Sequence, residues 1–257
     1  MRSSRLQRLS GYTVFLLLLA FVGMLYTAFA APKSRAAEEP GTEQSIAVKA
    51  GRELYLQGCS TCHGLNLQGG SGGPSLIGVG ESSVVFQVES GRMPLSAGVQ
   101  QAPRKKPKYT IAQIDQMAAY IGSKGGGPTI PTGLLNDGQL QLGGELFRTN
   151  CASCHNFAGS GGALSYGKYA PELSSSSARV IYSAMQTGPN NMPRFSDNQL
   201  TPEDKKAVVR YVQFITKGSQ PGGNDLGRYG PVPEGLVIWL VGITALVGIS
   251  LWIGARA

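Results

Sequence analysis

Two copies of one short motif, Cys-x-x-Cys-His, constrain this chain more than any other feature of its sequence. The first copy is CSTCH at residues 59–63, and the second is CASCH at residues 151–155. Together they use all four cysteines and both histidines of the 257-residue chain. An interpretation of the fold must therefore explain why every Cys and His stands in these two triplets.

The motifs belong to a longer internal repeat, which is the first pattern to look for in a sequence. Residues 51–63, GRELYLQGCSTCH, align without a gap with residues 143–155, GGELFRTNCASCH. Each motif is followed by a Gly-rich segment with a Pro-x-Leu, a short helical stretch, a Met-Pro pair and a final helix. Apolar spacing of i, i+3, i+4 predicts a helix before each motif, and Thr110 and Thr201 have the neighbours of helix N-caps.

Four interpretations of the triplet compete. A structural zinc ion takes four ligands, whereas each copy offers three and both together offer six. A disulfide does not explain the His after each Cys pair, and chance does not explain a triplet repeated within a repeat. Covalent attachment of haem c explains all three positions, because two Cys on one helical turn can form thioethers while the next residue ligates iron. This interpretation predicts two covalently bound haem c groups, attached and ligated by Cys59, Cys62, His63, Cys151, Cys154 and His155.

An iron that transfers electrons needs a sixth ligand, and the chain has no third His. The thioether of Met is then the available ligand. Met93 and Met192 each precede Pro at matching positions, and Pro holds the preceding residue extended, as in a loop. Met117 and Met185 fall in helical stretches, where packing in a core explains them better. Since His/Met ligation raises the reduction potential, both units are predicted to be electron carriers.

Two prolines and four aromatic residues are expected to support the haem sites. The carbonyls of Pro74 and Pro171 either accept a hydrogen bond from the axial His or belong to prolines that only shape the loop. Aromatic residues are expected to pack the first and last helices of each unit together: Tyr55 and Tyr120 in the first unit, Phe147 and Tyr211 in the second.

Both ends of the chain are apolar. Residues 9–32 carry no charge and follow three arginines, and they exceed the ~20 residues that a membrane span needs. They contain the small-residue segment AFA, so residues 1–32 are either a cleaved signal peptide or an N-terminal membrane anchor. Residues 235–255 are uncharged with a Trp near each end, which predicts a C-terminal transmembrane helix. In either case the repeated units are expected on the extracytoplasmic side of the plasma membrane.

The formal net charge of +8 does not predict nucleic-acid binding here. An exported, membrane-anchored chain rarely meets nucleic acid, and the basic residues are mostly dispersed. Their densest run is residues 103–109, PRKKPKY. This run is either a solvated loop or a docking segment for an acidic protein surface or for lipid headgroups.

With these motifs, each unit resembles a class I cytochrome c. In that family a Gly and an aromatic residue mediate the crossing of the first and last helices, a Pro carbonyl holds the axial His, and a Met in a later loop ligates the iron. The matching residues are Gly51, Tyr55, Pro74, Met93 and Tyr120, and then Gly143, Phe147, Pro171, Met192 and Tyr211. The resemblance implies an all-α chain with two tandem class I cytochrome c-like domains between the two terminal helices. The predicted domains are residues 46–124 and 139–217, joined by linkers at 33–45, 125–138 and 218–234.

Nearly the full length after residue 32 resembles the dihaem cytochrome c subunits of actinobacterial cytochrome bc1 complexes. The strings that carry the resemblance include GPSLIGVGE, QAPRK, FRTNCASCHNFAG, TGPNNMPRFS and PEGLVIWLVG. The resemblance implies a subunit of a menaquinol-oxidising quinol–cytochrome c reductase, with cytochrome b and Rieske iron–sulfur subunits as partners. One haem would take electrons from the Rieske centre. The other would pass them to an aa3-type cytochrome oxidase, in place of a mobile cytochrome c.

Two other functions are open to a dihaem chain. An electron-acceptor subunit of a periplasmic dehydrogenase would have the same haem motifs and a different partner. A dihaem peroxidase would need an open or His-switched iron with acid–base groups beside it. A chain with no spare His and one Met for each iron does not favour the peroxidase.

Overall fold

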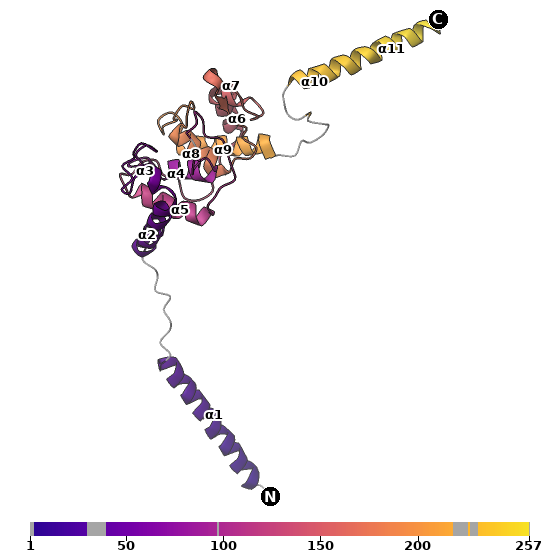
Figure 1. Ribbon diagram of the computed structural model, residues 1–257. Helices are drawn as coiled ribbons and strands as arrows, with labels where there is room; N and C mark the ends of the chain where they lie inside the picture. The colour runs from indigo at the N-terminus through magenta and orange to yellow at the C-terminus, as the bar shows by residue number, and fades with distance from the viewer. Residues whose placement is uncertain (1–2, 30–39, 97, 218–225, 227–230, 257) are drawn as a thin grey trace. The chain divides into compact units, whose positions relative to one another are not determined.

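The computed structural model is largely helical, as predicted (Figure 1). It describes residues 3–29, 40–96, 98–217, 226 and 231–256. The structure divides into two compact units, Met1–Ile46 and Ala47–Ala257. Within the described residues the only strands are two of two residues each, so the all-α prediction is confirmed.

The first unit contains helix α1, Ser3–Phe29, and the start of helix α2, Pro40–Gly58. Helix α1 includes the shorter apolar segment Thr13–Tyr26, whose large hydrophobic side chains are exposed. The predicted leader, residues 1–32, falls mostly on this helix, and its residues 30–32 lie outside the described ranges. Cleavage and retention of the leader both stay predictions.

The C-terminal apolar segment is helical throughout. It consists of α10, Pro231–Val237, the π-helical turn η4, Ile238–Gly242, and α11, Ile243–Gly254. Residues Val232–Gly254 form a stretch of 23 residues with no part buried, and about 20 are enough to cross a bilayer. Among the described helices it is the one with the length and composition of a membrane span. The predicted C-terminal helix is therefore confirmed.

The two repeated domains have the same helical plan. The first domain contains α2, α3 (Ser60–His63), α4 (Gly80–Val84), the π-helical turn η1 (Val85–Glu89) and α5 (Ile111–Gly122). The second contains α6 (Leu140–Asn150), α7 (Ala152–His155), β1 (Gly162–Ala163), the short 3-10 turn η2 (Ser165–Gly167), β2 (Tyr169–Ala170), α8 (Ala178–Thr187) and α9 (Pro202–Lys217). Strands β1 and β2 pair antiparallel in a small ribbon next to the second motif.

In the first domain α2 crosses α5 at Gly51. A Cβ at this position would lie 1.8 Å from the carbonyl oxygen of Gln116, so only glycine allows the backbones to approach this closely. One turn further along α2, the Tyr55 ring lies 5.6 Å from the Tyr120 ring between centroids. The predicted glycine and aromatic contact is confirmed in this domain.

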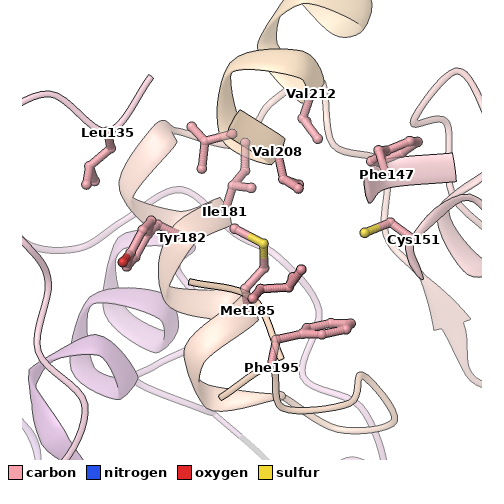
Figure 2. Close-up of a cluster of buried hydrophobic side chains, with 11 residues drawn as sticks. Leu135, Phe147, Cys151, Ile181, Tyr182, Met185, Phe195, Val208 and Val212 are labelled. Carbon is pink, nitrogen blue, oxygen red and sulfur yellow. The ribbon is translucent and has the colours of Figure 1, made fainter. Parts of the chain in front are cut away.

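The same crossing is repeated between α6 and α9. A Cβ at Gly143 would lie 2.0 Å from the carbonyl oxygen of Ala207, and the Phe147 and Tyr211 rings are 5.5 Å apart. The buried core around this crossing is shown in Figure 2. The repeat in the sequence is therefore a repeat in three dimensions.

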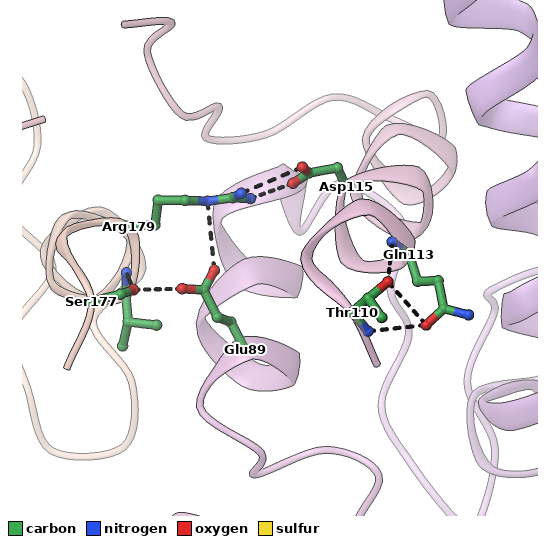
Figure 3. A network of polar contacts seen from close by, with 7 residues as sticks. Glu89, Thr110, Gln113, Asp115, Ser177 and Arg179 are labelled. Carbon is green, nitrogen blue, oxygen red and sulfur yellow. Dashed lines mark hydrogen bonds and ion pairs between the residues drawn. The ribbon is translucent and has the colours of Figure 1, made fainter. Parts of the chain in front are cut away.

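The predicted threonine lies directly before the last helix of each domain and caps it. Thr110 Oγ1 accepts from the backbone N–H of Gln113 at 3.3 Å, and Gln113 Oε1 accepts from the Thr110 N–H at 2.9 Å (Figure 3). Thr201 and Asp204 exchange the same pair of bonds at 3.2 and 3.0 Å. Both are capping boxes, which satisfy N–H groups that the first turn leaves unpaired.

The segment predicted as a linker, residues 125–138, packs against both domains. Ile130 contacts the cores of both domains, and Leu135 is a buried member of the second core. The carbonyl of Pro128 accepts from the backbone N–H of Ser82 in α4 at 3.0 Å. The connection is therefore part of the packed structure, which its Gly-rich sequence did not indicate.

The two domains also contact each other directly: α8 of the second domain packs against α4 and η1 of the first. Arg179 of α8 forms an ion pair with Glu89 of η1 at 3.5 Å and a second with Asp115 of α5 (Figure 3). The Ser177 hydroxyl donates to Glu89 Oε1 at 2.5 Å and accepts from the N–H of Val180, which caps α8. The interface therefore contains a buried carboxylate with partners from the opposite domain.

Candidate haem sites

Each Cys-x-x-Cys-His triplet folds as a kink followed by one helical turn. The kink lies at the first cysteine, with φ of −128° at Cys59 and −121° at Cys151. The next four residues form α3 and α7. The backbone N–H of His63 donates to the Cys59 carbonyl at 3.0 Å, and that of His155 to the Cys151 carbonyl at 2.9 Å. This turn gives both cysteines and the His of each triplet the helical spacing that haem attachment requires.

The chain reverses directly after each His. The next residue has a positive φ, +80° at Gly64 and +64° at Asn156. Gly adopts this conformation without steric cost, whereas with ψ of 154° it is sparsely populated for a residue with a side chain such as Asn156. The loop then returns, so that Gly69 and Gly161 donate their N–H groups to the carbonyls of the preceding His at 2.8 and 2.9 Å. Both loops thus bring a proline segment back beside the imidazole.

Each imidazole is held by a proline carbonyl. His63 Nδ1 lies 2.8 Å from the Pro74 carbonyl oxygen, and His155 Nδ1 lies 3.1 Å from that of Pro171. A carbonyl can only accept, so Nδ1 carries the proton and donates it to this bond. The lone pair of Nε2 is then free for a metal, which is the arrangement typical of His ligands in proteins.

In the second domain the motif faces a large apolar cavity. Cys151, Cys154, His155 and Met192 all line it, and with its open mouth it encloses about 1080 Å³ of space. Ligand sites in proteins usually combine apolar walls with a few polar groups. The walls include Val180, Ile181, Phe195, Val208 and Val212. These walls and donors fit a large, mostly apolar group that carries a metal, which an imidazole and a thioether could both bind.

Burial changes the acid–base properties of this cavity. It lowers the pKa of His155, although the bond to the Pro171 carbonyl opposes the shift, and so favours the neutral imidazole that binds metals. Burial also raises the pKa of Cys151 to about 11, with the nearby Cys154 adding to the shift. No group of three or more Cys, His, Asp or Glu side chains in the described part of the chain could hold a metal ion alone.

In the first domain Cys59 and Met93 pack against the same buried core, and Cys62 is exposed. Burial raises the pKa of Cys59, as it does for Cys151 in the second domain. Met93 lies in the segment after η1, and its backbone N–H donates to the Gln87 carbonyl at 2.9 Å. The structure therefore places the first cysteine and the Met of this unit on one core.

The two methionines assigned to cores are buried, Met117 to 1% exposure in α5 and Met185 to 2% in α8. Met185 also lines the cavity of the second domain. Figure 2 shows it facing Cys151 across the apolar space. The helical spacing that predicted a core position for Met185 did not indicate that this core borders the cavity.

Four further cavity residues come from the first domain: Phe86, Arg92, Gln101 and Arg104. Sequence analysis did not identify them as part of a site. Arg104 belongs to the basic run 103–109, which was expected to be solvated or to dock a partner. Arg104 contacts the other domain of the same chain, where it donates to Ser176 Oγ at 2.9 Å, whereas Lys105, Lys106 and Lys108 of the run are exposed.

Two family models match the repeated domains. Residues 48–124 match the model of cytochrome c, and residues 138–212 match that of cytochrome c oxidase, cbb3-type, subunit III. Cytochrome c domains imply covalently bound haem c, in agreement with the two Cys-x-x-Cys-His turns.

Over most of its length the chain is similar to proteins named cytochrome bc1 complex cytochrome c subunit. The one from Mycobacterium tuberculosis is 48% identical, covering 98% of this chain and 92% of the relative. The Mycobacterium leprae protein is 50% identical over 84% of this chain and 78% of the relative. The Corynebacterium efficiens protein is 46% identical over 93% and 86%.

Proposed function

Because the chain belongs to the family of cytochrome bc1 complex cytochrome c subunits, we propose that it is a membrane-anchored dihaem electron carrier. It takes electrons from the Rieske iron–sulfur centre of a menaquinol-oxidising bc1 complex. It delivers them to an aa3-type cytochrome oxidase, in place of a mobile cytochrome c. The complex is an oxidoreductase, and this chain is the electron-carrying subunit within it.

The proposed sites follow the repeat. One haem c is attached to Cys59 and Cys62 and the other to Cys151 and Cys154, and each supplies an iron that accepts and donates one electron. The axial ligands are His63 with Met93 in the first domain and His155 with Met192 in the second. The carbonyls of Pro74 and Pro171 orient the two imidazoles by accepting from Nδ1.

The observation that carries this proposal is the cavity of the second domain. Both cysteines, the His and the Met of the repeat unit line one apolar space, although Cys151 and Met192 are 41 positions apart in the chain. Partial burial also lowers the pKa of His155 and so favours the neutral imidazole. The protein thus orients two ligands and shields the site, which are the levers by which a protein tunes a haem.

The direct contact between the domains supports a relay within one chain. Helix α8 of the second domain packs on α4 and η1 of the first, and the connecting segment packs on both cores. Two haems held by domains in contact do not depend on diffusion to exchange an electron. This arrangement suits a carrier that replaces a mobile cytochrome c.

The C-terminal helix, Val232–Gly254, would anchor the chain in the plasma membrane. The haem domains would then lie on the extracytoplasmic side, where the bc1 complex and the oxidase exchange electrons. Membrane lipid is accordingly a further partner of this helix.

Co-purification from native membranes tests the proposed partners. The full chain, tagged and extracted in a mild detergent, is expected to bring down cytochrome b, a Rieske subunit and the subunits of an aa3-type oxidase. Menaquinol added to this preparation should reduce both haems, and a preparation that lacks the Rieske subunit should not respond. Recovery of a dehydrogenase in their place, with haems reduced by its substrate, would contradict the proposal.

A further inference from the structure

The cavity of the second domain has one wall that belongs to the first domain. Phe86, Arg92, Gln101 and Arg104 line it together with the second motif. Of all the residues that line the cavity, three carry a positive charge, Arg92, Arg104 and Lys168, and none carries a carboxylate. An apolar cavity with cations at its boundary is complementary to an apolar ligand that bears negative groups.

Arg92 is the least exposed of these cations, at 5%. Its guanidinium carbon lies 4.8 Å from the centre of the Phe86 ring, a cation–π contact that fixes the side chain against the cavity wall. Its Nε is buried and has no hydrogen-bond partner among the described residues. A charge kept in such surroundings is costly unless a negative group pairs with it.

The segment that carries these residues is held firmly on the second domain. The Gln101 side-chain amide exchanges two hydrogen bonds with the backbone of Tyr169 in β2, at 2.8 and 3.1 Å. Arg104 donates to Ser176 Oγ at 2.9 Å and also to the Ser175 carbonyl. Because a guanidinium has five N–H donors, these bonds leave Arg104 with donors to spare. The wall is therefore built into the interface between the domains.

We propose that Arg92, supported by Arg104, binds a propionate carboxylate of the haem attached in the second domain. The first domain thereby completes the haem site of the second. The inference rests on the proposed attachment of that haem to Cys151 and Cys154. An Arg–carboxylate pair is strong and directional when shielded from water, and this one would neutralise a guanidinium that has no carboxylate beside it among the residues lining the cavity.

The pair has a consequence for the reduction potential. A haem propionate stabilises the ferric state, because its negative charge lies close to the more positive iron. Arg92 and Arg104 offset this charge and so favour the ferrous state. The potential of the second haem should therefore be raised by residues of the first domain.

A redox titration of the full chain, purified with both haems, tests the inference. Arg92→Gln and Arg104→Gln are each expected to lower the midpoint potential of the second haem, with the larger shift for Arg92→Gln. That haem is identified as the one whose potential changes in Met192→Leu. Arg92→Lys keeps the charge and should restore most of the wild-type value, which a purely packing role would not produce.

Arg210→Gln is the matched control. It removes one positive charge from the exposed face of α9, where Arg210 bonds the Gly138 carbonyl at 2.8 Å and does not line the cavity. Its potentials should equal those of the wild type. If the titration resolves both haems and the midpoint potential of the second haem is unchanged in Arg92→Gln and in Arg104→Gln, this inference alone is overturned. A wild-type chain whose intact mass shows fewer than two haem groups would overturn the proposed function and the inference with it.

Discussion

The two repeated domains have matching Cys-x-x-Cys-His turns, and the cavity beside the second turn takes part of its wall from the first domain. Both have the same kinked turn, the same positive-φ residue after the His and the same imidazole–carbonyl bond. The hydrophobic core of each domain contains residues of that domain and of the connecting segment 125–138. The second cavity takes four of its lining residues from the first domain.

This difference suggests that the two copies depend on each other unequally. A local backbone motif is kept in both copies, because the attachment chemistry constrains every residue of the turn. The outer wall of a cavity is less constrained, so a neighbouring domain can replace it. The first domain can accordingly be expected to tolerate changes in the second better than the second tolerates changes in the first.

The largest effect is expected from substitution of the two methionines that line the second cavity, Met185 and Met192. Met192→Leu should abolish the sulfur-to-iron absorption band of the second haem and lower its potential, because the thioether ligand is lost. Met185→Leu keeps volume and apolarity and should cost less than about 1.5 kcal/mol of stability with the band intact. Absorption spectra of the oxidised full chain distinguish the two. Loss of the band in Met185→Leu but not in Met192→Leu would reverse the ligand assignment.

The helix crossings provide the next largest effect. Gly143→Val would place a Cβ 2.0 Å from the Ala207 carbonyl oxygen, and Gly51→Val would place one 1.8 Å from that of Gln116. Each should cost about 3 kcal/mol or more, because two backbones must separate. Denaturant unfolding followed by haem absorption gives the loss for each domain.

Gly144→Ala is the control for this pair. Its Cβ would meet only side-chain atoms, of Tyr211 at 3.0 Å and of Arg148 at 3.2 Å, which can move. If Gly144→Ala were as damaging as Gly143→Val, close approach of the backbones would not be the reason that glycine is needed.

The ion pairs between the domains should have a smaller effect. Arg179→Ala leaves Glu89, whose side chain is 8% exposed, with only its bond to Ser177. A loss of about 1–3 kcal/mol is expected from a buried carboxylate that loses a charged partner. Arg179→Ala also breaks the pair with Asp115, so Asp115→Asn, which breaks that pair alone, is the control. Asp115 is 52% exposed, and about 1 kcal/mol or less is expected from its loss. Equal losses in thermal unfolding would mean that burial does not distinguish the two pairs.

The helix caps should show the two domains at their most similar. Thr110→Ala and Thr201→Ala each remove a hydroxyl that accepts from the third residue of a helix. Each should cost about 1 kcal/mol. Unfolding midpoints measured for both variants should fall by similar amounts, and a clear difference would show that the caps are not equivalent.

Much of this architecture could be predicted because it depends on short stretches of sequence. The motif turns, the glycine at each crossing, the paired aromatic residues and the threonine caps each follow from a few neighbouring residues and their spacing. The two-domain helical plan followed from aligning these features within the chain.

The contacts between the domains could not be predicted in the same way. Arg92 and Gln101 stand in loops without periodicity, and Ser177 and Arg179 resemble ordinary residues at a helix start. The partners of Gln101, Ser177 and Arg179 lie 64 to 90 positions away along the chain, and no local pattern joins residues at that separation. The charge of the basic run 103–109 could not show that Arg104 bonds to serines of the other domain in the same chain.

Attachment of one haem to each Cys-x-x-Cys-His turn is the central claim, and the intact mass of the denatured full chain tests it most directly. After extraction with acidified solvent, the mass should exceed that of the polypeptide by two haem groups. In a double variant that replaces both cysteines of one turn with Ala, the mass excess should fall to one haem group. The two variants are Cys59→Ala with Cys62→Ala, and Cys151→Ala with Cys154→Ala. A wild-type chain that loses all its haem to the solvent would contradict the account.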